Sequence, residues 1–410
     1  GWGAPPLVSW RRRLSDTFPD HEEFDVTARD AMRLAGLGYR MYRYIQRERH
    51  AGRIPIMNPF YKSPAGPRMG VPIGGIGSGT IGRGWLGSFG RWQLYPGFPN
   101  YETVDANAFA VHVGPRAGKR GSLPKATVLS AVAPKSKVLE RAWDWKLHGR
   151  RSSYYARYPL AWTVYNEPDD HVRLTCKQLS PVIAHNYKES SYPVGTFEWH
   201  IENLDAENER VVSLMFSFQN GIGEEAADTA GGHTNRLFVA PMGSGPNVVG
   251  IAMSKAGKAY RRGDYLWKPG MDPVVDDDMG SSTDSDLDTD INWEEVMKSG
   301  LDPKIEEALA ASASKLLDKP LQKADPLTLG IAVQPDDDRS CDIFWCQKYI
   351  TNNLDSASRL WHSFKADGSV ADTDDSGPAR PGETIGSCLA VRFRVPPGGV
   401  RSLVFALAWD

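Results

Sequence analysis

The fold is decided by two short apolar segments, Gly195-Thr196-Phe197-Glu198-Trp199-His200-Ile201 and Val211-Val212-Ser213-Leu214-Met215-Phe216-Ser217-Phe218. In the first segment, apolar residues alternate with polar ones, which is the pattern of a half-buried β-strand. Five further segments have a similar texture: Phe109–Val113, Ala161–Tyr165, Val172–Cys176, Leu389–Val395 and Leu403–Trp409. Because helix-length periodic segments hardly separate them, we predict a mainly β fold, a large antiparallel β-sandwich, rather than βαβ units.

The chain divides around these strands into a sandwich domain and two additions. We assign residues 1–69 to an N-terminal helical extension, residues 70–410 to the β-sandwich domain, and residues 272–325 to an acidic insertion within that domain. The first part of the insertion is rich in Asp and Ser and lacks the apolar content to fold alone. A helix is predicted after it, over Asp302–Leu317, with Pro303 in its first turn.

A second helix is predicted in the N-terminal extension, from Thr27 to Arg49. Thr27 is a suitable N-cap, and Asp30 completes an acidic variant of the capping box. Apolar residues recur every three to four positions, and five arginines make the helix basic: Arg33, Arg40, Arg43, Arg47 and Arg49. The pattern fits a helix that packs on the domain with a solvated basic face, and it also fits peripheral contact with anionic lipid headgroups.

Composition narrows the class of protein. With 41% hydrophobic and 24% charged residues, the 410-residue chain is typical of a globular protein. Its formal net charge of -2 gives no overall positive field, so nucleic acid is not an expected partner. Four scattered cysteines favour a reduced, intracellular protein, although Cys341 and Cys346 could bridge if the backbone turned back. No signal peptide and no run of about 20 apolar residues is recognised.

The densest motif is a glycine-rich block that begins at Gly70 and continues to Leu94. Its glycines Gly77, Gly79 and Gly82 match the letters of a dinucleotide-binding fingerprint. That fingerprint requires a helix to start at the glycines, and Gly84, Gly87 and Gly90 oppose one. The block therefore predicts tightly turning strands and loops at which another backbone or a ligand comes close, and no cofactor is expected.

The acidic insertion contains a near match to a calcium-binding loop between Asp284 and Glu295. Oxygen-bearing side chains occupy the ligand positions, but Thr289 stands where such a loop needs glycine. An Asp-rich insertion produces this match easily. The histidines are dispersed without paired zinc spacing, so no metal site is predicted.

Aromatic residues beside polar or glycine-rich turns are the best lead to a ligand. They are Trp85, Trp92, Tyr95, Tyr101, Trp162, Tyr187 and Tyr192. Aromatic faces near Arg, Gln and Asn suit sugar rings, but such rings also pack in sandwich cores and domain interfaces. Glycosidases need two carboxylates that face a sugar, and no local pattern selects such a pair here, so no catalytic residue is assigned.

Two blocks together carry a resemblance to a known family. The first is Gly70–Ile81 with its continuation through Arg83-Gly84-Trp85 and Phe89–Leu94; the second is Ser180–Gly195. Tyr158–Tyr165 and the closing Ala406-Leu407-Ala408-Trp409-Asp410 fit as well. With them the chain resembles the family 116 glycoside hydrolases, and within that family the enzymes that act on glucosylceramide. The resemblance extends from about Trp10 to Asp410 and leaves out the acidic insertion.

This resemblance implies an amino-terminal β-sandwich followed by an (α/α)6 helical barrel. The barrel of such enzymes carries the Glu nucleophile and the Asp acid/base, which hydrolyse β-glucosides such as glucosylceramide with retention. The last residues look like a strand cut off at its end, so we expect this chain to be a fragment, inactive by itself, that lacks the barrel. The family resemblance also implies a peripheral position on the cytosolic face of endoplasmic reticulum and Golgi membranes.

Candidate substrate or interdomain contacts lie in the two blocks. They are Trp85, Arg91, Trp92, Gln93, His185, Asn186 and Tyr187. The partner expected for them is the helical catalytic domain or a β-glucoside. A catalytically inactive glycan-binding, glycolipid-binding or scaffold domain is the alternative, since the aromatic-rich turns permit it.

Overall fold

The computed structural model describes residues 4–17, 34–50, 70–94, 100–116, 122–223, 225–241, 247–255, 328–335, 341–373 and 377–410. The chain forms two compact units. The first comprises Gly1–Phe18, Pro64–Lys258 and Pro326–Asp410, and the second comprises Pro19–Ser63 and Ala259–Asp325. The described β-strands and the sites considered below all belong to the first unit.

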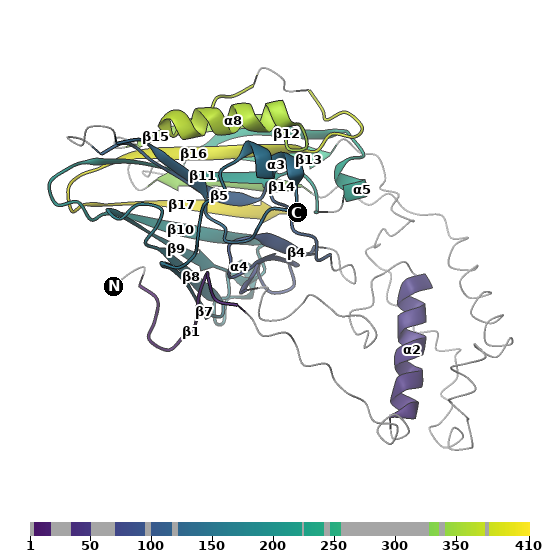
Figure 1. The fold of residues 1–410 in the computed structure, drawn as a ribbon. Coiled ribbons are helices and arrows are strands. Elements are labelled where there is room, and N and C mark those ends of the chain that lie inside the picture. The colour runs from purple at the N-terminus through teal and green to yellow at the C-terminus, as the bar shows by residue number, and fades with distance from the viewer. Residues whose placement is uncertain are drawn as a thin grey trace. The chain divides into compact units, whose positions relative to one another are not determined.

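The largest element of the first unit is a nine-stranded antiparallel sheet (Figure 1). Its strands in spatial order are β1 (Trp10–Arg13), β7 (Ser152–Arg157), β8 (Leu160–Tyr165), β9 (Val172–Leu179), β10 (Val194–Asn203), β17 (Val400–Trp409), β14 (Leu329–Pro335), β13 (Val248–Lys255) and β12 (His233–Ala240). In β10, buried and half-buried residues alternate along the whole strand, as its sequence predicts. All seven predicted strands are present.

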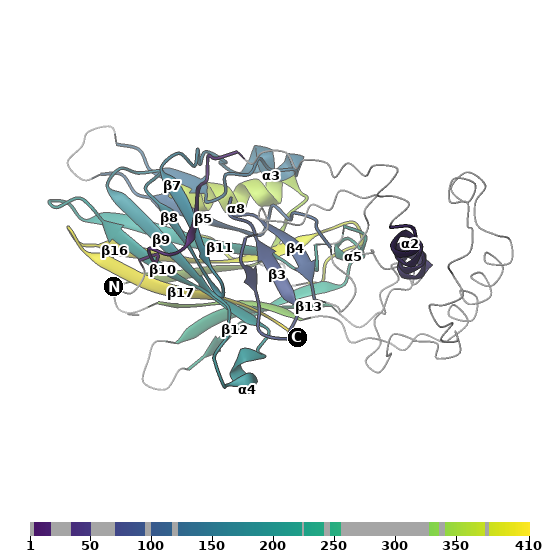
Figure 2. The ribbon, with the colours of Figure 1, turned by 90° about the horizontal axis from the view of Figure 1, so that it is seen from below.

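Two smaller sheets accompany it. A five-stranded sheet has the order β15 (Cys341–Ile350), β16 (Ile385–Val395), β11 (Arg210–Gln219), β5 (Ala108–Val113) and β6 (Lys125–Val128). The glycine-rich block forms a three-stranded sheet of β2 (Pro72–Ile73), β3 (Thr80–Arg83) and β4 (Phe89–Gln93). Figure 2 shows β3 and β4 at the same end of the strands as the C terminus. No helix forms between Gly70 and Leu94, as expected.

The core lies between the two large sheets. Phe109 of the five-stranded sheet stacks on Phe216 with ring centroids 4.3 Å apart, and it meets Phe197 of the nine-stranded sheet at 4.9 Å. Phe89 of the glycine-rich block packs against the same rings. Because both sheets bury their facing side chains in one cluster, the predicted mainly β sandwich is confirmed.

The sequence predicted hardly any helix between the strands, but a helix of 14 residues lies between two of them. Helix α8 (Leu354–Asp367) separates β15 from β16 and covers the five-stranded sheet, as Figure 1 shows. Its buried residues Ala357, Leu360, Trp361 and Phe364 have helical spacing. Asn353 caps its first turn and Gly368 ends it with φ of +80°. Short helices α3 (Lys137–Ala142), α4 (Tyr187–Ser190) and α5 (Glu225–Asp228) lie in connections.

In the second unit, the structure describes helix α2 (Ala35–His50). This helix confirms the larger part of the helix predicted from Thr27, and its last turn carries Arg47, Arg49 and His50. The predicted cap at Thr27, the calcium-like loop and the helix over Asp302–Leu317 lie outside the described residues. None of the four cysteines forms a disulfide, so Cys341 and Cys346 are not bridged. No described helix has the length and apolar character needed to cross a membrane.

Candidate functional site

The glycine-rich block turns so tightly because its glycines lie against other backbone segments. A Cβ atom at Gly75 would lie 2.3 Å from the carbonyl oxygen of Ser190 and 2.6 Å from that of Tyr192. A Cβ atom at Gly74 would lie 2.9 Å from Cζ2 of Trp409. The close approach predicted for this block therefore occurs at Gly74 and Gly75. Around Gly77 the space is open, and its φ of +78° is what favours glycine there.

Hydrogen bonds join the two blocks that carry the family resemblance. The Ile76 N–H donates to the Ser190 carbonyl oxygen at 2.6 Å. The Ser180 hydroxyl donates to the Pro72 carbonyl oxygen at 2.9 Å. Trp409, at the end of β17, donates its Nε1–H to the Ser78 carbonyl oxygen at 2.7 Å. We call the surface formed by residues 74–79 and 180–193 the glycine-block surface.

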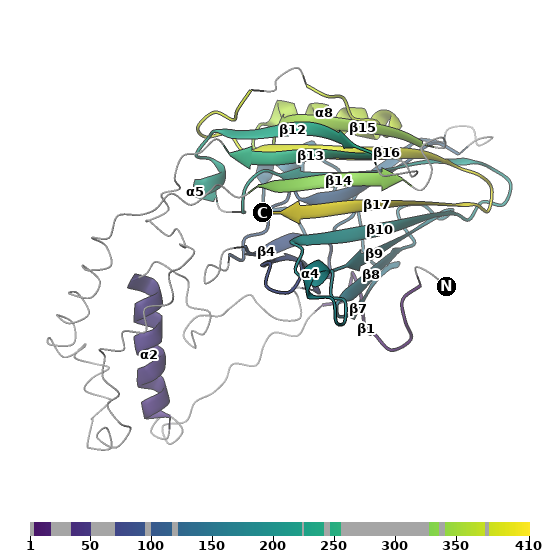
Figure 3. The ribbon, with the colours of Figure 1, turned by 180° about the vertical axis from the view of Figure 1, so that it is seen from behind.

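Four large apolar side chains stay exposed on this surface. The exposed fractions are 52% for Ile76, 47% for Ile183, 80% for Tyr187 and 44% for Tyr192. Figure 3 shows α4, which carries Tyr187, at the same end of the strands as the C terminus. The segment beneath these side chains is held in place, because Ser190 binds both the N–H and the carbonyl of Ile183 through its hydroxyl.

The seven candidate contact residues fall into two groups: four are buried or half-buried within the glycine-rich block, and three belong to the second block. Trp85 and Trp92 are buried, and Trp92 donates its Nε1–H to the Glu102 carbonyl oxygen at 2.8 Å while it packs against Phe218. Arg91 and Gln93 are half-buried and bonded to each other at 3.0 Å. The remaining three, His185, Asn186 and Tyr187, belong to the glycine-block surface. Their assignment as substrate or interdomain contacts stays a prediction.

Tyrosine hydroxyls and a buried arginine anchor the block to the nine-stranded sheet. Burial raises the pKa of Tyr154 to about 12, so its neutral hydroxyl accepts a hydrogen bond from the Val71 N–H at 2.9 Å. Arg83 is 1% exposed, donates to the Tyr165 hydroxyl at 3.2 Å, and lies 5.5 Å from the centre of the Phe109 ring. This buried cation is held by hydroxyls and aromatic faces.

A cavity of about 500 Å³ lies beside α3 and is lined by Trp143, Trp145, Glu140 and Asp144 among others. Although burial raises the pKa of Asp144, hydrogen bonds from Lys146, Lys365 and Trp361 outweigh it and lower the pKa to about 2. Glu140 is exposed and pairs with Lys137 at 2.8 Å. A glycosidase acid needs a raised pKa to stay protonated, and Asp144 has the opposite environment.

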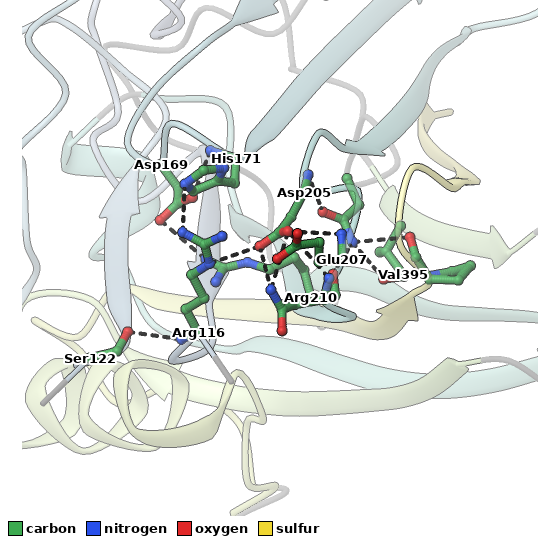
Figure 4. Close-up of polar contacts among 11 residues, drawn as sticks. Arg116, Ser122, Asp169, His171, Asp205, Glu207, Arg210 and Val395 are labelled. Atoms are coloured by element: carbon green, nitrogen blue, oxygen red, sulfur yellow. Dashed lines mark hydrogen bonds and ion pairs between the residues drawn. The ribbon is translucent and has the colours of Figure 1, made fainter. Parts of the chain in front are cut away.

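Ion pairs of two buried carboxylates, Asp169 and Asp205, hold together the loop before β9 and the loop after β10 (Figure 4). Asp169 pairs with Lys125 at 3.1 Å and with the buried Arg210 at 3.2 Å. Asp205 pairs with Arg116 at 2.8 Å. Burial opposes ionisation of Asp169, but hydrogen bonds from the His171 N–H and Lys125, and the charge of Arg210, lower its pKa. This network fixes the loops around residues 169–171 and 205–210.

Among the described residues, no His, Cys, Asp or Glu side chains gather as a metal site.

A comparison with known protein families finds a match that covers most of the chain. The family model described as "beta-glucosidase 2, glycosyl-hydrolase family 116 N-term" matches residues 70–410. The chain therefore belongs to glycoside hydrolase family 116, as the amino-terminal domain of that β-glucosidase family. The resemblance noted from the two sequence blocks is confirmed at the level of the family.

Proposed function

We propose that this chain is the amino-terminal domain of a retaining β-glucosidase that hydrolyses glucosylceramide to glucose and ceramide. In this proposal a helical domain of the (α/α)6 type supplies the nucleophilic Glu and the acid/base Asp. The observation that carries it is the glycine-block surface, where four apolar side chains stay exposed on a rigidly bonded segment. Exposed apolar side chains that gather in one region of a surface are typical of places that bind another part of a protein.

The chain's own residues would brace the helical domain and wall the mouth of its active site. Retaining hydrolysis needs two carboxyl groups about 5–5.5 Å apart, one of them protonated. The lowered pKa of Asp144, the carboxylate beside the tryptophans, does not suit the protonated acid. Membership of the glycoside hydrolase family supports placing both catalytic carboxyl groups in the other domain. This domain would hold the helical domain in position and exclude water from its active site. Closing an active site strengthens the electrostatic interactions inside it.

The proposal includes peripheral attachment to the cytosolic face of endoplasmic reticulum or Golgi membranes. Helix α2 supports it, because three basic residues gather in its last turn: Arg47, Arg49 and His50. Basic helices bind anionic lipid headgroups.

The size and activity of the native protein test the enzyme proposal. An antibody raised against this chain should detect a native protein far heavier than 45.3 kDa, and the immunoprecipitate should release glucose from glucosylceramide. The 410-residue chain alone should release none. A single native band near 45.3 kDa, without hydrolysis, would refute the proposal.

Polar substitutions on the glycine-block surface should uncouple the two domains. In the native enzyme, the double variant Ile183→Ser and Tyr187→Ser should lower glucosidase activity about tenfold or more, because both side chains lose apolar contact area. The melting temperature of the isolated chain should change little, since both side chains are exposed. Val239→Ser is the matched control, since Val239 is 59% exposed on β12. Equal activity of the double variant and the control would contradict the docking role.

A glycan-binding domain without catalysis is the second candidate, and the cavity beside α3 favours it. Trp145 is half-buried and stacks on Trp143, with ring centroids 6.3 Å apart and planes 18° apart. Aromatic faces beside carboxylate and ammonium groups suit a sugar ring. Saturable binding of glucosylceramide by the 410-residue chain, lost in Trp145→Ala and without hydrolysis by the native protein, would favour this candidate.

A further inference from the structure

A cavity lined by arginines lies at the edge of the nine-stranded sheet. Its volume is about 520 Å³, within the range of ligand pockets. Its lining residues come from β1, β7 and the turn before it, the loop after β8, the start of β9 and the residue after β10. The arginines among them are Arg11, Arg13, Arg150, Arg151 and Arg173. We call it the arginine cavity. Five of its ten lining residues are arginines, and one lining residue, Asp170, is a carboxylate.

The positive charge of this cavity is only partly balanced. Arg151 pairs with Asp170, and Arg173 reaches Glu202 at 3.3 Å. Arg11, Arg13 and Arg150 have no ion pair among the described residues. Like charges gathered at one cavity repel each other, and a bound anion removes that cost.

The walls of the arginine cavity are ordered by backbone pairing and buried ion pairs. Strand β1 pairs with β7, so that Arg13 lies opposite Ser153. The Arg13 N–H also donates to the Asp16 carboxylate at 2.9 Å. On the other wall, Asp169 and the His171 N–H form the network that fixes the loop carrying Asp170. A cavity with fixed walls binds a ligand without a large ordering cost.

We propose that the arginine cavity binds the phosphate group of a phosphomonoester. Guanidinium groups match phosphate oxygens with two parallel hydrogen bonds. A doubly charged phosphate offsets two of the three arginine charges that lack a carboxylate partner. The cavity lies at the start of β9, whereas the glycine-block surface follows the end of that strand at Leu179. The proposal is therefore independent of the docking role, and it covers both a soluble phosphate ester and the headgroup of an anionic lipid.

Calorimetric titration of the 410-residue chain with inorganic phosphate tests the cavity. Saturable binding should weaken about tenfold or more in the double variant Arg13→Gln and Arg150→Gln, and it should weaken as salt is raised. Arg394→Gln is the matched control, because Arg394 is an exposed arginine on β16 outside the cavity. Asp170→Asn should bind phosphate more tightly, a gain that misfolding does not produce.

Sedimentation with lipid vesicles distinguishes a lipid headgroup from a soluble phosphate ester as the ligand. If a lipid headgroup is the ligand, the chain should sediment with phosphatidylcholine vesicles that contain phosphatidic acid, and the double variant should not. If a soluble ester is the ligand, inorganic phosphate alone should bind. Absence of binding in both experiments, or binding that the double variant leaves unchanged, would overturn the proposal.

Discussion

Replacing Asp169 with asparagine is expected to lower the free energy of unfolding by about 3–5 kcal/mol, the usual cost of leaving a buried charge without its partner. Arg210 is 3% exposed and Asp169 is its ion-pair partner at 3.2 Å. The Nε and Nη1 atoms of Arg210 have no hydrogen-bond partner among the described residues, so little else compensates the buried cation. Chemical denaturation of the 410-residue chain at neutral pH measures the loss.

The neighbouring Asp170 supplies the control for this experiment. Its side chain is 72% exposed and its pair with Arg151 is open to water, so Asp170→Asn should leave the melting temperature nearly unchanged. The two variants remove the same charge from adjacent positions. Equal losses of stability in both would show that burial of the Asp169 pair does not matter.

The effect of Asp169→Asn should also depend on pH. The folded protein lowers the pKa of Asp169 from its ordinary value of 3.8, so the ionised form stabilises the fold at pH values above 3.8. This stabilisation is lost as the pH falls through the lowered pKa. The difference in stability between the unmodified chain and Asp169→Asn should therefore shrink below about pH 4. A difference that stays constant down to pH 2 would contradict the ion-pair explanation.

Alternating polarity predicted strands such as β10, because one face of its sheet packs on the core. Strands β5 and β11 are buried on both faces and were predicted from nearly continuous apolar runs instead. Phe197, Trp199 and Ile201 are each fully buried, at every second position of β10. The same reading missed α8, although Leu360, Trp361 and Phe364 repeat at helical spacing between Asn353 and Gly368, which are clear start and stop signals. Sequence spacing alone did not indicate that a helix would cover the outer face of a sheet.

The sites were harder to predict because their residues meet only through the fold. The arginine cavity is built when β1 pairs with β7, which brings Arg11 and Arg13 beside the turn with Arg150 and Arg151. Arginine doublets and triplets at those positions were the available signal. Trp85 and Trp92 are buried and Tyr187 is exposed, a difference that depends on tertiary packing. Residue type alone could therefore not predict which of these aromatic side chains would be exposed.

Gly75→Ala is the second change expected to have a large effect, and it tests why the block is rich in glycine. The added methyl group would lie 2.3 Å from the Ser190 carbonyl oxygen, a distance that forces one backbone to move. The Ile76 N–H bond to that same oxygen would be strained or lost. We expect a loss of about 3 kcal/mol in the free energy of unfolding, the upper part of the usual range for overpacking.

Gly77→Ala is the matched control, two residues away in the same turn. Its Cβ atom would meet nothing within 4 Å, so only the φ of +78° opposes it, at a cost of about 1–2 kcal/mol. Denaturation curves should therefore place Gly75→Ala below Gly77→Ala in stability. The reverse order would mean that turn conformation, and not the approach of the 180–193 segment, explains the glycines. Because Gly75→Ala displaces the segment that carries Ile183 and Tyr187, it should also lower glucosidase activity in the native enzyme, whereas Gly77→Ala should leave that segment in place.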